Sequence, residues 1–316
     1  MHIVVLDDYQ RLASRMGRWS RLGPDTTVEA IGEHVEGPDL VAVLRGADVV
    51  VAMRERTAIT RQLFEQLPRL RLVVTTGMVN QVIDFVAAAD HGVTVCGTGG
   101  LVLPTAELTW GLIIGLLRHI PAEDAAVRAG GWQHTLGTGL NGRTLGVVGL
   151  GRLGASVARV GQAFDMDVQA WSPNLTAEKC AEHGVRPATK AALFATSHVV
   201  TVHMVLGPAT RGLVGRTEIG SMRRDAVLVN TSRGPLVDQD ALAEALREER
   251  IAGAALDVFE REPLPAADVF RSLPNTVVTP HIGYVTDETM QVFYDDIVED
   301  IRAFRAGAPI RVMTSG

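Results

Sequence analysis

Short runs of β-branched and aliphatic residues alternate along the chain with segments of helical length. In the first third, the pattern predicts strands at residues 3–6, 48–53, 70–75 and 93–96, with helix-length segments at 61–67 and 83–91. A second series begins at residue 144, with predicted strands at 144–149, 168–171, 198–204, 226–230, 254–258 and 276–279 and predicted helices at 153–163, 177–183 and 239–248. Such alternation is typical of parallel sheets covered by helices, so we expect an α/β fold.

Two further segments separate these series. Residues 104–119 are apolar around most of a helical circumference, which predicts a helix buried on several sides. The glycine-rich segment 129–144 is expected to form an irregular arm, and a last helix at about 287–306 is expected to pack back on the first domain. We therefore predict two doubly wound parallel-sheet domains, a flavodoxin-like domain (1–102 plus 285–316) and an inserted domain of the Rossmann type (103–284).

The composition excludes several classes of partner. The 316 residues are 47% hydrophobic and 21% charged, and 30 basic against 36 acidic residues give a net charge of −6. The basic excess that drives binding to nucleic acid or to an anionic membrane is missing. The most apolar stretch, 108–117, is about half the ~20 residues that cross a bilayer. The N-terminus lacks the basic region of a signal peptide, and Cys96 and Cys180 have no disulfide or metal-ligand spacing, so we expect a cytoplasmic protein without a metal.

A glycine motif follows the first strand of the second series. Residues 149–154 read Gly-Leu-Gly-Arg-Leu-Gly, end an apolar run and open a predicted helix, which aims backbone N–H groups at a pyrophosphate. The expected dinucleotide-binding residues of this loop are Gly149, Gly151, Arg152, Leu153 and Gly154. A second match at 137–142 precedes a strand and lacks this context. The chain has no Walker loop, His-Glu-x-x-His helix or Gly-x-Ser-x-Gly elbow.

The sequence leaves the choice between NAD and NADP open. NAD-preferring domains of this type place Asp or Glu about 20 residues after the loop, where it bonds the ribose hydroxyls. Ser172 occupies that place here, and no arginine follows in the turn to attract a 2′-phosphate. His203 ends another predicted strand at the same edge of the sheet and is expected to line the cofactor pocket.

Three blocks of the last third resemble a known enzyme family. The blocks are 227–238, which contains Asn-Thr-Ser-Arg-Gly-Pro, 253–265, which contains Leu-Asp-Val-Phe-Glu-Arg-Glu-Pro, and 279–283, which reads Thr-Pro-His-Ile-Gly. Together with 75–77, 104–107 and the glycine loop, they resemble the D-isomer-specific 2-hydroxyacid dehydrogenases over most of the chain.

The resemblance implies roles for individual residues. Arg233 would anchor the substrate, Glu262 would partner the catalytic histidine, and His281 would be the acid and base. The residues that it implies beside the cofactor are Thr231, Asp257 and Gly283. In the first domain, the loop with Met78 and Val79 would meet the substrate carboxylate through backbone N–H groups. Many relatives have smaller or more polar side chains at these two positions, so no substrate preference is carried over.

The chemistry of these residue types agrees with the resemblance. Hydride arriving at a 2-keto carbon builds negative charge on the oxygen, and a histidine can supply the neutralising proton near neutral pH. A glutamate beside that histidine favours the imidazolium. An arginine fork holds a carboxylate in two hydrogen bonds. Arg233, Glu262 and His281 all follow predicted strands, at the edge where open α/β sheets bind ligands.

We therefore predict an NAD(P)-dependent oxidoreductase that transfers hydride between a nicotinamide cofactor and a small 2-hydroxy or 2-keto acid of the D series. An oxidoreductase acting on another small anion such as phosphite would use the same residues, and a non-catalytic, nucleotide-sensing relative is a further alternative. A methyltransferase would have no use for Arg233, Glu262 and His281. The apolar helix 104–119 and the arm predict a homodimer through the cofactor domain, which the resemblance also implies.

Overall fold

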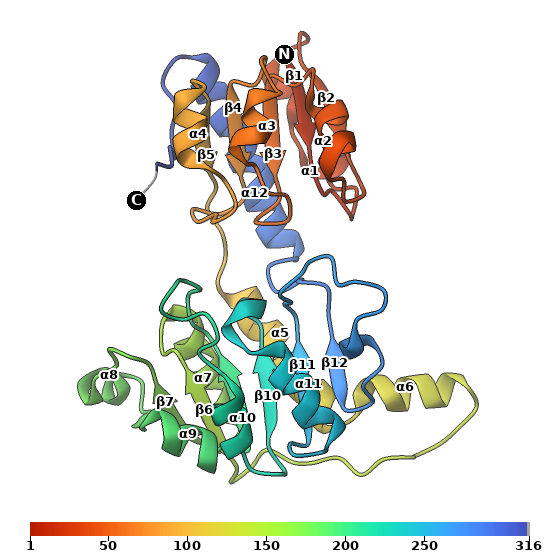
Figure 1. Cartoon of the computed structure of the whole chain (residues 1–316), viewed down its shortest axis with the longest axis vertical. Coiled ribbons are helices and arrows are strands. Elements are labelled where there is room, and N and C mark those ends of the chain that lie inside the picture. The colour runs from red at the N-terminus through yellow and green to blue at the C-terminus, as the bar shows by residue number, and fades with distance from the viewer. Residues whose placement is uncertain (315–316) are drawn as a thin grey trace. The chain divides into compact units, whose positions relative to one another are not determined.

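The computed structural model describes residues 1–314 and divides into two units. The first unit comprises Met1–Leu101 and Val285–Gly316, and the second comprises Val102–Tyr284. Each unit is built around its own sheet (Figure 1), and the strand pairs of both sheets are parallel. The predicted fold class, two doubly wound parallel-sheet α/β domains, is confirmed.

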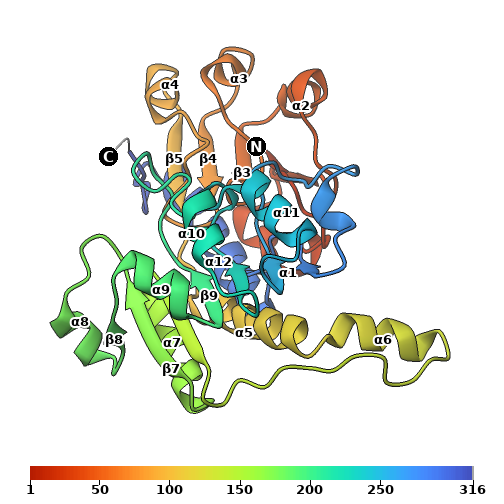
Figure 2. The same ribbon diagram turned by 60° about the horizontal axis from the view of Figure 1, so that its bottom comes forward.

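The first unit holds a five-stranded sheet in the order β2-β1-β3-β4-β5, which is the flavodoxin-like order. Its strands are β1 (His2–Val5), β2 (Thr27–Ala30), β3 (Val49–Ala52), β4 (Leu72–Thr75) and β5 (Thr94–Gly97). Helices α2 (Gly37–Leu44), α3 (Arg61–Glu65) and α4 (Phe85–Asp90) cover one face, and α1 (Ala13–Met16), the 3-10 turn η1 (Trp19–Leu22) and α12 (Asp287–Arg305) lie on the other (Figures 1 and 2). The last helix, α12, packs against β4, α1 and η1, as the pattern at 287–306 predicts.

The second unit holds a seven-stranded sheet in the order β12-β11-β10-β9-β6-β7-β8. Its strands are β6 (Thr144–Val148), β7 (Asp167–Trp171), β8 (Arg186–Pro187), β9 (Val199–Val202), β10 (Val227–Asn230), β11 (Gly253–Leu256) and β12 (Thr276–Val278). The chain reverses direction across the sheet between β6 and β9, which is the switch point at which doubly wound domains bind dinucleotides.

Helices cover both faces of this second sheet. They are α5 (Leu103–Leu117), α6 (Ile120–Arg128), α7 (Arg152–Ala163), α8 (Ala177–Glu182), α9 (Lys190–Thr196), α10 (Arg216–Ser221) and α11 (Gln239–Arg247), with 3-10 turns η2 (Gly234–Leu236) and η3 (Val269–Arg271). On one face α5 packs against α7, β10, β11 and β12, as the apolar pattern of 104–119 predicts. On the other face α9, α10 and α11 share a second apolar core with the sheet.

Among the helices and strands of the described residues, the sequence pattern missed α1, β2, α2, α6, β8, α9 and α10. The two edge strands are largely exposed and carry no apolar run, so they give no strand signal. The start of α6 is separated from α5 by His119, whose φ of +53° breaks the helix, and none of its residues is buried. Beyond α6, residues 129–143 contain no helix or strand, as expected of the arm, and Figure 2 shows α6 extending away from the sheet of its own unit.

Candidate active site

The glycine loop joins β6 to α7, and its three glycines meet different surroundings. Gly149 has a φ of +99°, and a Cβ there would lie 2.5 Å from the carbonyl oxygen of His203. A Cβ on Gly154 would lie 2.0 Å from the carbonyl oxygen of Gly149. A Cβ on Gly151 would have nothing within 4 Å. The fold therefore requires the first and third glycines, whereas the second leaves its backbone open to a ligand.

This open backbone lies at the N-terminus of α7. The first N–H groups of a helix have no partner within the helix, and no side chain caps α7. Arg152 and Leu153 form its first turn, which contains no acidic residue. The residues fit a dinucleotide pyrophosphate, because uncapped N–H groups and the positive end of the helix face an uncrowded surface at the switch point.

His203 follows β9, the strand beside β6. Its ring Nε2 lies 2.8 Å from the hydroxyl oxygen of Thr201, and Nδ1 is buried without a hydrogen-bond partner among the described residues. Burial lowers the pKa of the His203 ring to about 3, so the ring is neutral at physiological pH. The backbone of His203 lies next to Gly149 of the glycine loop, and its unsatisfied ring nitrogen fits a site that a polar ligand completes.

The ribose end of the expected site lies where β7 ends. Ser172 follows Trp171, the last residue of that strand, and is partly exposed. The structure also brings the side chain of Lys190 to this end of β7. Sequence reasoning missed this cation because it comes from a different element, the start of α9. Its Nζ lies 5.6 Å from the centroid of the Trp171 ring and 2.8 Å from a carboxylate oxygen of Glu218. Thr231, which follows β10 at the same edge of the sheet, is 5% exposed.

Arg233 stands in a tight turn after β10. The Asn230 side chain donates to the backbone carbonyl of Arg233 over 2.9 Å, which holds the turn. A Cβ on the next residue, Gly234, would lie 2.0 Å from the carbonyl carbon of Phe259. Because residue 234 is glycine, the turn with Arg233 can approach the segment that leads to Glu262. The positive charge of Arg233 helps to lower the pKa of the Glu262 carboxyl.

Glu262 and His281 form a close pair. Nδ1 of His281 lies 2.6 Å from one carboxylate oxygen of Glu262, and the other oxygen accepts the backbone N–H of Phe259 over 2.9 Å. Burial alone would raise the pKa of the Glu262 carboxyl, but the hydrogen bond and charge of His281 hold it below its usual value. Because Nδ1 is engaged, Nε2 is the ring nitrogen of His281 that remains for a substrate.

Asp257 holds the loop that carries His281. The Asp257 side chain is fully buried, and its oxygens accept the hydroxyl of Thr279 over 2.5 Å and the backbone N–H groups of Ile282 and Gly283 over 2.9 and 2.8 Å. Burial raises the pKa of the Asp257 carboxyl, against the effect of these bonds. Its carboxylate is therefore committed to the loop, a task that the sequence did not reveal.

The loop with Met78 and Val79 belongs to the first unit and follows β4. The two side chains are 48% and 56% exposed. The N–H of Gly77 donates to the hydroxyl of Thr98, whereas no hydrogen bond of the described residues uses the N–H groups of Met78 and Val79. Arg54, which sequence reasoning missed, donates to the carbonyl of Thr76 in this loop over 3.1 Å. Two adjacent backbone donors are thus available to an anion.

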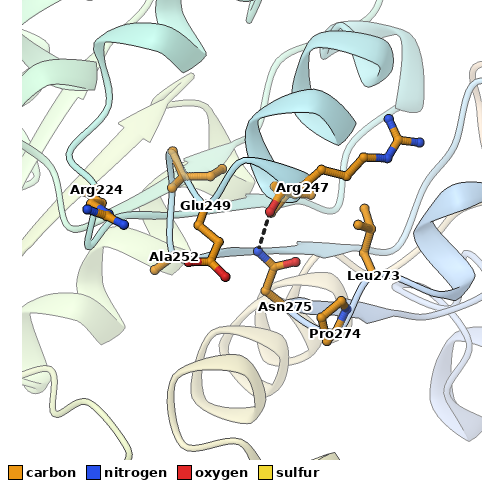
Figure 3. A pocket seen from close by; sticks show the side chains of 9 residues that line it. Arg224, Arg247, Glu249, Ala252, Leu273, Pro274 and Asn275 are labelled. Carbon is orange, nitrogen blue, oxygen red and sulfur yellow. Dashed lines mark hydrogen bonds between the residues drawn. The ribbon is translucent and has the colours of Figure 1, made fainter.

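A cavity of the second unit lies away from these groups. It has a volume of about 460 Å³ and is lined in part by Arg224, Arg247, Glu249 and Asn275. Figure 3 shows the Asn275 amide, whose Nδ2 donates to the carbonyl of Leu246 over 3.1 Å. Asn275 directly precedes β12, so this cavity lies at the sheet edge opposite to the one that carries Arg233, Glu262 and His281.

Residues 1–314 offer neither a metal-binding cluster nor a membrane-spanning helix. No group of three His, Cys, Asp or Glu in that range could hold a metal ion. None of its helices combines the length and apolar character of a membrane span. Cys96 and Cys180 are both buried free thiols.

The family model described as "D-isomer specific 2-hydroxyacid dehydrogenase, NAD binding domain" matches residues 110–283, more than half of the chain. The chain belongs to the D-isomer specific 2-hydroxyacid dehydrogenase family. As a family member it carries an NAD-binding domain in its second unit.

The proteins that are similar to this chain include differently named enzymes of different length. The D-3-phosphoglycerate dehydrogenase of Bacillus subtilis is 36% identical over 261 residues, which cover 82% of this chain and 50% of that protein. The glyoxylate reductase of Korarchaeum cryptofilum is 36% identical over 256 residues, 79% of this chain and 77% of that protein. The crystal structure of a phosphoglycerate oxidoreductase from Vibrio cholerae has a TM-score of 0.93 at 36% identity, over 98% of this chain and 100% of that one. The chain spans about half the length of the curated D-3-phosphoglycerate dehydrogenases of Bacillus subtilis and Methanocaldococcus jannaschii.

Proposed function

We propose that this protein is a D-2-hydroxyacid dehydrogenase that interconverts a small 2-keto acid and the D-2-hydroxy acid with a nicotinamide cofactor. The observation that carries the proposal is the 2.6 Å pair of Glu262 and His281, at the same sheet edge as Arg233 and the open glycine loop. Family membership supports it, because the relatives are named as dehydrogenases and reductases of such acids.

Each residue has a task in keto-acid reduction. Arg233 binds the substrate carboxylate. For the first unit, the proposal keeps the substrate-binding role that the family resemblance implies for the loop with Met78 and Val79. His281 donates a proton from Nε2 to the carbonyl oxygen, and Glu262 stabilises the protonated ring through Nδ1. When bound, the reduced nicotinamide supplies the hydride. In the reverse direction the neutral ring of His281 accepts the hydroxyl proton.

The glycine loop and its neighbours bind the cofactor in this proposal. Gly149, Gly151, Arg152, Leu153 and Gly154 form the pyrophosphate site at the start of α7. The remaining cofactor residues are Ser172, His203, Thr231, Asp257 and Gly283. We propose that both NAD and NADP are accepted, because Ser172 neither repels a 2′-phosphate nor attracts it, and Lys190 nearby is already paired with Glu218.

We further propose a cytoplasmic homodimer formed through the second unit. Apolar side chains of α6 and the arm are exposed in the single chain, including Ile120 at 51%, Val127 at 50%, Trp132 at 75% and Leu136 at 92%. A partner subunit seated on α6 and the arm would cover these exposed apolar side chains. The buried free thiols of Cys96 and Cys180 suit a reducing compartment. The proposed domain roles are substrate binding for 1–102 plus 285–316 and cofactor binding for 103–284.

A spectrophotometric screen tests the activity. Oxidation of NADH and NADPH is followed against glyoxylate, hydroxypyruvate, phenylpyruvate, branched 2-keto acids and 3-phosphohydroxypyruvate, with phosphite and NAD as the opposing arm. With the best substrate, His281→Ala should lose about 10²–10⁴-fold in kcat while NADH binding, followed by fluorescence, is retained. A variant that keeps more than about a tenth of wild-type kcat contradicts the role of His281, since general acid catalysis is worth more than that.

A further inference from the structure

The side chain of Thr105 on helix α5 reaches the loop of His281. Thr105 lies in the first turn of α5, in the block 104–107, to which the proposed mechanism gives no task. Its Oγ1 donates to the carbonyl oxygen of Gly283 over 3.0 Å. That carbonyl belongs to the segment 279–283, which carries His281. Thr105 thus reaches the catalytic loop from an element that contributes no residue to the reaction.

The loop is held from two sides at Gly283. Asp257 accepts the N–H of Gly283 on one side, and Thr105 donates to its carbonyl on the other. A Cβ on Gly283 would lie 3.1 Å from Cγ2 of Thr105 and 3.3 Å from a carboxylate oxygen of Asp257. Gly283 is therefore enclosed between the two side chains, and a shift of either one moves the backbone two residues from His281.

His281 needs such a restraint because its backbone is strained. Its φ is +55°, in the left-handed region that residues other than glycine rarely adopt. Conformations of this kind persist only where the surroundings over-determine them. The 2.6 Å contact with Glu262 restrains the ring, whereas the bonds to Asp257 and Thr105 restrain the backbone.

We propose that Thr105 is a positioning residue that keeps the His281 loop in its reactive conformation through the carbonyl of Gly283. The proposal rests on the proposed dehydrogenase function for its kinetic consequences, but the restraint itself is a property of the protein alone. A ring displaced by a fraction of an ångström still binds Glu262, yet presents Nε2 to the substrate in a poorer geometry, which lowers the rate of proton transfer.

The decisive variants are Thr105→Val, which keeps the shape and removes the hydroxyl, and Thr105→Ser, which keeps the hydroxyl. With the best keto acid, Thr105→Val should lose about tenfold in kcat, the size expected when a buried carbonyl loses its donor, with KM for NADH within about twofold of wild type. Thr105→Ser should recover most of the loss. The matched control is Ser197→Ala, which removes another buried hydroxyl of the second unit. Ser197 lies just before β9, and its hydroxyl accepts a hydrogen bond from the side-chain amide of Gln169.

A second readout needs no turnover. In protein isotope-labelled at histidine Cε1, the ring signal of His281, identified by its loss in His281→Gln, should move in Thr105→Val and stay in place in Thr105→Ser and Ser197→Ala. If wild type turns over no keto acid, the proposed function fails, and this signal still tests the restraint. An unmoved signal together with unchanged kcat in folded Thr105→Val overturns the proposal. So does a loss in Thr105→Ser as large as that in Thr105→Val, which would assign the effect to packing.

Discussion

Replacing Glu262 by Gln tests the electrostatic pairing at the centre of the site. The amide keeps the shape of the side chain and withdraws the charge that faces Nδ1 of His281 over 2.6 Å. In the wild-type protein this contact outweighs burial and holds the pKa of Glu262 below its ordinary value of 4.5, which reports a favourable interaction between carboxylate and ring. Without the charge, the protonated ring loses its stabilisation, so ketone reduction should decline at lower pH than in wild type.

The size of the effect follows from the geometry. The side chains are 27% and 16% exposed, so solvent screens the pair only partly. The second oxygen of Glu262 is held by the N–H of Phe259, which prevents the carboxylate from turning away. A hydrogen bond to a charged group is worth about 1.5–3 kcal/mol. At about 1.4 kcal/mol for each factor of ten, loss of the charge should lower kcat/KM at pH 8 by about tenfold to a hundredfold.

The assay is kcat/KM for keto-acid reduction from pH 5 to pH 9. The loss in Glu262→Gln should be greater near pH 8 than near pH 5.5. Glu260→Gln removes the same charge two residues away, where the side chain is 65% exposed, and should leave the profile in place.

The pair of Glu262 and His281 also stabilises the folded state above pH 4.5. The lowered pKa of the Glu262 carboxyl contributes stability that is lost as the pH falls through that lowered pKa. An unshifted profile in a folded variant that binds NADH would refute the coupling of Glu262 to His281.

Three further predictions address the cofactor site and assembly. Gly151→Ala should fold normally and weaken NADH binding by about tenfold, since its Cβ enters the open space at the loop. Gly154→Ala should instead lower Tm, because its Cβ would lie 2.0 Å from the carbonyl oxygen of Gly149. If Gly151→Ala binds NADH as tightly as wild type, the pyrophosphate does not bind at this loop. Ser172→Asp should raise the NAD-over-NADP ratio of kcat/KM about tenfold or more, and an unchanged ratio in an active variant would mean that the ribose does not lie beside Ser172. Light scattering should give about twice the 33.9 kDa chain mass, and a monomer at every concentration would contradict the dimer.

The fold class followed from local patterns. Buried parallel strands are nearly continuous apolar runs, so the sequence pattern predicted β1, β3, β4 and β6. The glycine motif could also be recognised locally, because a strand, a tight turn and a helix follow one another within a few residues. Short exposed elements such as β2 and α6 left no such pattern.

What the sequence provided by itself is therefore the set of candidate groups for the proposed chemistry: the glycine loop, Arg233, Glu262 and His281 stand in recognisable blocks. Only the tertiary structure showed which other side chains contact these groups or the loops that carry them. Lys190 reaches the end of β7 from α9, Asp257 binds two N–H groups of the loop after β12, and Thr105 meets Gly283 across 178 positions of sequence. The physical reason is that a catalytic side chain is marked by its own chemistry, whereas a supporting hydrogen bond depends on where two distant segments meet once the sheet has formed.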